Sequence, residues 1–100
     1  MAAQQKMVGG IGEVKEATEE VQSLLDQVKN DVEEAAGKTF ETFTAVSFKT
    51  QVVAGVNYFV KVKVGEGKYI HVRIYKHFSG TVSFSSFQDD KTEEDPIEYF

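Results

Sequence analysis

Apolar residues recur at helical spacing through the first third of the chain, with charged and amide side chains between them. The apolar positions are Val14, Ala17, Val21, Leu24, Leu25, Val28, Val32, Ala35 and Ala36. Thr18 is a suitable N-cap, and two glutamates follow it where negative charge favours the helix dipole. Gly37 is a natural C-cap. The pattern therefore predicts one long amphipathic helix over residues 18–36.

Beyond Gly37 the chain is rich in β-branched and aromatic residues, which favour strands. The predicted strands cover about residues 39–50, 56–64, 69–75 and 81–88. The second strand shows the clearest alternation, interrupted only by Phe59, and its apolar face consists of Val56, Tyr58, Val60, Val62 and Val64. In the third strand, apolar residues alternate with polar and aromatic ones, which predicts that His71 lies on the solvated face of the sheet.

A closed core forms most simply if the apolar face of the helix packs on the apolar face of the sheet. Short connections between successive strands imply an antiparallel meander. The predicted fold is therefore α+β, with one long helix packed across a four- to five-stranded antiparallel sheet. We expect a single domain over residues 1–100, with a flexible leader at residues 1–12 and a closing Tyr99-Phe100 that docks on the body.

The turn between the first two strands is poor in the Asn, Asp, Gly or Pro residues that hairpin turns normally carry. Its sequence is Gln51-Val52-Val53-Ala54-Gly55, in which Gly55 alone supplies turn chemistry. One interpretation is that the valines simply continue the sheet. The other is that they form an exposed apolar tip that contacts a partner, and we favour it because the chain must reverse near Gly55.

Alternate hairpin tips of a meander lie at the same end of its sheet. The third tip, His77-Phe78-Ser79-Gly80, is therefore predicted beside the valine tip, and the polar turn at residues 65–68 is predicted at the far end. The helix start and the leader segment Val8-Gly9 are predicted at the valine end as well. We therefore expect Val8-Gly9, Val52-Val53-Ala54 and Phe78 to form an exposed apolar ridge of the kind that marks a partner site. The plainer interpretation of the leader glycines is a flexible tail without a role.

Composition excludes several classes of function. With 16 acidic against 11 basic residues and a net charge of −5, the chain has no basic field for a nucleic acid. It has no cysteine, so it forms neither a disulfide nor a thiolate site. His71 and His77 belong to no recognisable catalytic motif, and the acidic residues lack metal-ligand spacing. We therefore predict that the protein is not an enzyme and needs no metal or cofactor.

Hydropathy gives an expectation about location. No apolar run is long enough for a signal peptide or for a membrane span. Together with the absence of cysteine, this favours the cytoplasm and predicts no membrane partner, and it leaves secretion by another route open. The nucleus is a second expected location.

The valine tip is also where the sequence resembles a known family. Residues Gln51 to Gly55 match the Q-x-V-x-G signature of the stefins, the type 1 cystatins, within a longer similar segment over residues 45–62. The likeness extends to residues 7–10, 25–28, 69–75 and 99–100, so it covers nearly the full chain.

The resemblance implies a cystatin-like fold and a reversible, tight-binding inhibitor of papain-like cysteine proteases. The partners that it implies are papain and cathepsins L, H, S and B, whose active-site cleft such inhibitors block with a wedge of three elements. Carried over to this chain, the elements are Val8 with Gly9, the tip Gln51-Val52-Val53-Ala54-Gly55, and the second loop His77-Phe78-Ser79.

The chain departs from the family pattern in three places. Its leader is longer, the stretch after Gly80 is shorter, and the second loop has Phe78-Ser79 where the family commonly has Leu-Pro. Phe78 keeps an apolar contact, but Ser79 lacks the rigidity of proline.

A rival hypothesis is a self-associating structural or protein-interaction module, because a β-branched tip and long strands also suit edge pairing. We expect a monomer that is able to form a domain-swapped dimer.

Overall fold

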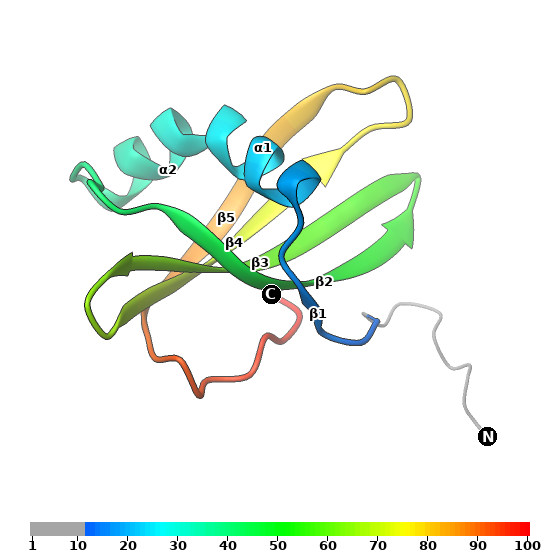
Figure 1. The fold of residues 1–100 in the computed structure, drawn as a ribbon. Helices are drawn as coiled ribbons and strands as arrows, with labels where there is room; N and C mark the ends of the chain where they lie inside the picture. The colour runs from blue at the N-terminus through cyan, green and yellow to red at the C-terminus, as the bar shows by residue number, and fades with distance from the viewer. Residues whose placement is uncertain (1–11) are drawn as a thin grey trace.

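The computed structural model describes residues 12–100, in which two helices pack on a five-stranded antiparallel sheet (Figure 1). The elements are β1 (Lys15–Glu16), α1 (Glu19–Gln27), α2 (Lys29–Ala36), β2 (Thr44–Val53), β3 (Gly55–Gly65), β4 (Lys68–Lys76) and β5 (Val82–Lys91). The α+β class and the strand count are as predicted. The predicted leader falls at residues 1–12, of which only Gly12 is among the described residues.

The helical region begins and ends as the caps indicate. The Thr18 hydroxyl accepts a hydrogen bond from the Val21 backbone N–H at 3.2 Å, and Gly37 closes the region in the left-handed conformation, with φ 75°. The prediction of one uninterrupted helix is a small inaccuracy, because the backbone leaves helical geometry at Val28 (φ −106°, ψ 8°). Val28 is nevertheless buried, so the periodicity continues through the break. Neither helix within residues 12–100 is long and apolar enough to cross a membrane.

The sheet is a meander in the order β1-β2-β3-β4-β5. The first predicted strand is shifted toward the C-terminus, since β2 begins at Thr44 and runs through the two valines, and β5 extends past the predicted end to Lys91. The short strand β1, which the sequence pattern does not single out, pairs with β2 through Lys15 opposite Phe48.

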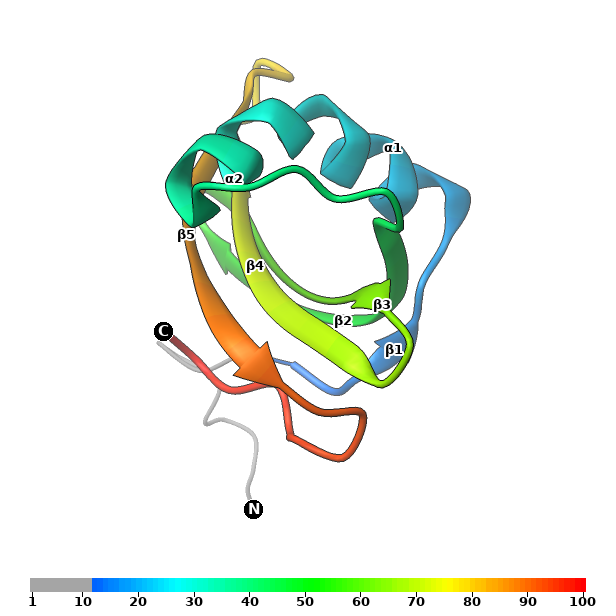
Figure 2. The ribbon, with the colours of Figure 1, turned by 90° about the vertical axis from the view of Figure 1, so that its left-hand side faces the viewer.

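The core lies between the helices and the concave face of the sheet, which curls around them (Figure 2). The alternating residues of β3 and β4 supply the sheet side, and the apolar stripe of α1 and α2 supplies the other. The fully buried members are Val21, Leu25, Val28, Val32, Val60, Val62, Ile70, Val72 and Ile74. Burial of this one face fixes the register of the strands.

The opposite face of the sheet is covered in part by the C-terminal segment, residues 92–100. The Phe59 ring, which interrupts the alternation of β3, packs against Tyr99 and Phe100 with ring centroids 5.7 and 5.6 Å apart. The guanidinium of Arg73 lies over Phe59 and donates a hydrogen bond to the carbonyl oxygen of Phe100. Docking of Tyr99-Phe100 on the body is therefore confirmed, and it explains the apolar residue on a face predicted to be polar.

The prediction that His71 lies on a solvated face is wrong. His71 is fully buried on the outer face of β4, beside Lys61, which donates to the carbonyl oxygen of Glu93 in the covering segment. Burial lowers the pKa of the imidazole to about 4, and the nearby positive charges of Lys61 and Lys91 lower it further. The charge of Asp95 and a hydrogen bond with Gln88 oppose this shift and raise the pKa, but by less. The error arises because period-two alternation identifies the two faces of a strand but not what covers each.

The position of His71 predicts a loss of stability in mild acid. The pKa of His71 is about 4 in the folded state and 6.5 for a histidine in water, so between these pH values the unfolded state binds a proton that the folded state does not. The free energy of unfolding should therefore fall as the pH drops from 6.5 to 4, by up to about 3 kcal/mol from this residue. Urea unfolding at several pH values should show a shallower fall for His71→Leu. An unchanged pH dependence in the variant would contradict the assignment.

Candidate functional site

The first hairpin joins β2 to β3 through a single residue outside the ladder, Ala54. Val53 pairs with Gly55 and Val52 with Val56, so the two valines continue the sheet, as one interpretation of the sequence held. They are nevertheless exposed, with 77% of the Val52 surface and 43% of the Val53 surface open to solvent. Both interpretations are therefore correct in part: the strand extends beyond the core and carries apolar side chains into solvent.

Gln51 and Gly55, the first and last residues of the predicted tip, are buried and hold the hairpin in place. Gln51 is only 7% exposed, and its side-chain oxygen accepts a hydrogen bond from the Asn57 amide at 3.0 Å. Gly55 has φ 129°, and a Cβ at this position would lie 2.6 Å from the carbonyl oxygen of Lys76. Glycine is thus required here, both for the backbone conformation and for the close approach to β4.

The second hairpin, between β4 and β5, presents Phe78 with 74% of its surface exposed. His77 organises the loop: its backbone N–H donates to Thr81, and its carbonyl accepts from the Gly80 N–H at 2.9 Å. The Ser79 N–H donates to Nδ1 of His77 at 3.1 Å, and the Ser79 hydroxyl lies 3.0 Å from the same nitrogen. These side-chain contacts hold the loop without the proline that the family pattern leads one to expect.

Both hairpins lie at the same end of the sheet, and the turn between β3 and β4 lies at the other (Figure 1), as meander parity predicts. The start of α1 reaches this end too, because Glu20 forms an ion pair with Lys76 at 3.4 Å. We call Val52, Val53, Ala54 and Phe78 the apolar edge. Val8 and Gly9, the third predicted element, lie outside the described residues.

Two residues that the sequence does not single out stand directly behind the apolar edge. Asn57 pairs with Gln51 on one side and with Tyr75 on the other, so the three form a row across β2, β3 and β4. The Tyr75 hydroxyl donates to the carbonyl oxygen of Ala54. Meander register could have found both, because it places polar residues of three strands opposite one another just below the tip.

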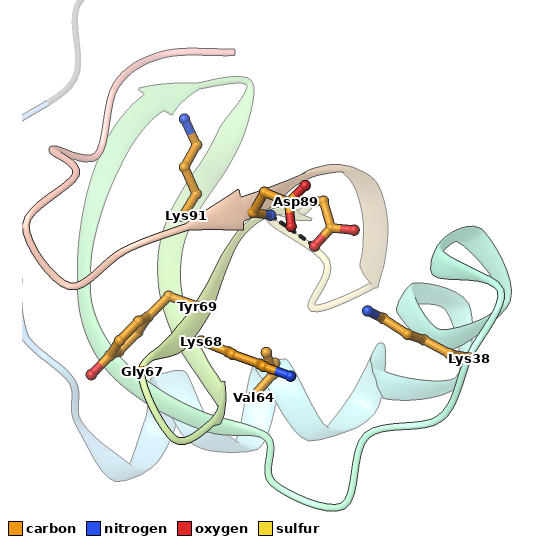
Figure 3. Close-up of a pocket in the computed structure, with 8 residues that line it drawn as sticks. Lys38, Val64, Gly67, Lys68, Tyr69, Asp89 and Lys91 are labelled. Atoms are coloured by element: carbon orange, nitrogen blue, oxygen red, sulfur yellow. Dashed lines mark hydrogen bonds between the residues drawn. The ribbon is translucent and has the colours of Figure 1, made fainter.

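Other parts of the described chain offer less for binding. Among residues 12–100 there is no group of three or more His, Asp or Glu placed to hold a metal ion. A hollow of about 300 Å³ lies at the opposite end of the sheet, lined in part by Lys38, Lys68 and Asp89. In Figure 3 the Tyr69 ring and Lys91 point away from the space between Lys38 and Asp89. Charges of both signs border this hollow without converging on one point, so the apolar edge is the better candidate site.

Known proteins resemble this chain over nearly its whole length. A family model described as the cystatin domain matches residues 9–94. Cystatin-A of Mus musculus is 46% identical over 92% of this chain and 97% of its own, and stefin-C of Bos taurus is 41% identical over 93% and 95%. The sequence motifs favour a likeness to cystatin B, and cystatin-B of Oplegnathus fasciatus is 42% identical over 94% of this chain and 97% of its own.

The crowding at Gly55 predicts a specific loss of stability. Gly55→Ala should lower the free energy of unfolding by about 2–3 kcal/mol, because a strained φ is joined by a clash with the backbone of β4. Gly80→Ala is the matched control, since Gly80 also has a positive φ, of 101°, but a Cβ there meets nothing within 4 Å. Urea unfolding should show the larger loss for Gly55→Ala. Equal losses would mean that crowding against β4 contributes nothing.

Proposed function

The chain belongs to the cystatin family, among the stefins, and we propose that it blocks papain-like cysteine proteases reversibly by filling their active-site cleft with the apolar edge. Family membership makes it an inhibitor of cysteine proteases in general and not an enzyme. Our proposal goes beyond this in three respects: it assigns roles to individual residues, names the target proteases and gives a location in the cell.

The observation that carries the proposal is that Val52 and Phe78, the two most exposed large apolar side chains among residues 12–100, lie with Val53 at one end of the sheet. Exposed apolar surface that adds nothing to the core is a typical feature of a binding surface. Transfer of these side chains from water into an apolar cleft is favourable by roughly 25 cal/mol for each Å² buried. Neither residues 50–56 nor residues 77–82 contain Asp, Glu, Lys or Arg, so a cleft that covers them desolvates no side chain of these four types.

The backbone of the first hairpin suits an inhibitor better than a substrate. Val53 and Gly55 are paired in the β2–β3 ladder, and the carbonyl oxygen of Ala54 accepts from the Tyr75 hydroxyl. A peptide bond held in this way is not free to extend along a cleft and to meet a nucleophile in attack geometry. A hairpin that is already ordered also loses little conformational freedom on docking. Binding is therefore non-covalent and reversible in this proposal.

Val8 and Gly9 complete the proposed wedge, with Gly9 allowing close backbone approach to the protease. The proposed targets are papain and cathepsins L, H, S and B. The inhibitor acts in this proposal as a monomer in the cytoplasm, and also in the nucleus, with a domain-swapped dimer as a secondary form.

A charge in the apolar edge should abolish tight inhibition. Val53→Asp places a carboxylate where the cleft offers apolar contact, so we expect the inhibition constant for papain to rise at least 100-fold, about 3 kcal/mol. Val46→Asp is the matched control, because Val46 lies on the same strand with a similar exposure of 37%, roughly 20 Å from Val53.

Retention of parental inhibition by Val53→Asp, or an equal loss in Val46→Asp, would show that the edge is not the binding surface. Each variant and the parent are first separated by size-exclusion chromatography, and every fraction is assayed. Inhibition by an oligomeric fraction alone would favour the self-association hypothesis.

The leader should matter more where access to the cleft is restricted. Deletion of residues 1–9 is expected to weaken inhibition less for papain than for a related protease whose cleft is partly occluded. In an occluded cleft the apolar edge enters less easily, so the contact made by the leader contributes more to binding. Inhibition constants for the two proteases, measured with the parent and the deletion variant, check this. Equal losses on both would contradict a separate leader contact.

A further inference from the structure

Tyr75 contacts both hairpins, through Ala54 on one side and His77 on the other. It lies one residue before the end of β4, on the outer face of the sheet, opposite Asn57 of β3 and Ser83 of β5. It is only partly buried and is not a member of the hydrophobic core. Its hydroxyl therefore acts on the neighbouring hairpins and not on the packing of the helices.

The first contact of Tyr75 is with the tip of the β2–β3 hairpin. Its hydroxyl donates to the carbonyl oxygen of Ala54, the single residue outside the ladder. The approach is close because Gly55 has no side chain: a Cβ there would lie 2.6 Å from the phenol oxygen of Tyr75 and 2.8 Å from its ring carbon Cε1. Gly55 thus makes room for the phenol at the same point where it turns the chain.

The second contact is with the β4–β5 hairpin. The edge of one ring meets the face of the other between Tyr75 and His77, at 6.3 Å between centroids and 70° between planes. His77 in turn holds Ser79 by hydrogen bonds to Nδ1, and its ring lies 6.3 Å from that of Phe78. A continuous chain of contacts therefore leads from Ala54 through Tyr75 and His77 to Phe78.

We propose that Tyr75 is a positioning residue that couples the two hairpins, so that Val53 and Phe78 meet a protease as one preformed unit. The coupling itself concerns the free protein, and its effect on inhibition rests on the proposed function. Two loops held in register lose less conformational freedom on binding than two loops that move independently. Such pre-organisation prolongs the lifetime of the complex more than it speeds association.

Tyr75→Phe removes only the hydroxyl and keeps the ring that packs beside His77. Tyr69→Phe is the matched control, because Tyr69 lies on the same strand and the same face, at the end next to the turn between β3 and β4. Hydrogen–deuterium exchange of the free protein should be about five- to tenfold faster at residues 52–56 in Tyr75→Phe than in the parent, with a smaller increase at residues 77–81. Exchange near residues 65–68 should not change, and Tyr69→Phe should leave both hairpins as in the parent.

The same variants are then tested on papain. Tyr75→Phe should dissociate about five- to tenfold faster with a nearly unchanged association rate, and Tyr69→Phe should match the parent. Parental exchange at both hairpins in Tyr75→Phe would overturn the coupling, as would an equal effect of Tyr69→Phe. If the parent failed to inhibit papain while Tyr75→Phe still loosened both hairpins, the proposed function would fall and the coupling would stand.

Discussion

Burial of the concave face of the sheet against α1 and α2 is the constraint on which the rest of the structure depends. Val60, Val62 and Val72 are fully buried there, and a shift of one residue in any strand would turn such side chains outward. The register that this burial enforces places Val53 opposite Gly55 and Lys76 opposite Val82. The positions of both hairpins, and hence the apolar edge, follow from packing on the other side of the molecule.

The sequence was sufficient for the fold wherever one physical signal acted alone. Helical periodicity, the Thr18 cap and Gly37 predicted the helical region, and alternation predicted the strands of the meander. The prediction failed where contacts between distant parts of the chain determine burial: His71 is buried because the C-terminal segment, residues 92–100, covers its face of the sheet. No local pattern marks the break at Val28, since the apolar spacing continues across it.

The candidate site was predictable to a similar degree. Valines are unfavourable in a turn, so their presence between two strands marks the apolar edge in the sequence alone. The supporting residues were less visible, because Asn57 and Tyr75 look like ordinary polar positions of a strand. Their role depends on the Gln51–Asn57 hydrogen bond and on the contact of Tyr75 with Ala54, which exist only once three strands are aligned.

Charged residues are concentrated away from the two hairpins that form the apolar edge. Residues 13–36 hold eight acidic and two basic residues, and residues 89–98 hold six acidic residues and one lysine, whereas residues 50–56 and 77–82 hold none of either sign. Most of the acidic residues are therefore carried by the helical region and the C-terminal segment. The proposed contact between the apolar edge and a protease therefore depends on short-range packing, for which complementary shape matters more than long-range electrostatic attraction. The proposed function requires the apolar edge to be rigid, because misplacing an apolar side chain by the width of a methyl group forfeits much of its contact energy. Gln51 of β2, Asn57 of β3 and Tyr75 of β4, together with His77 of the following loop, make the contacts that supply this rigidity in our proposal.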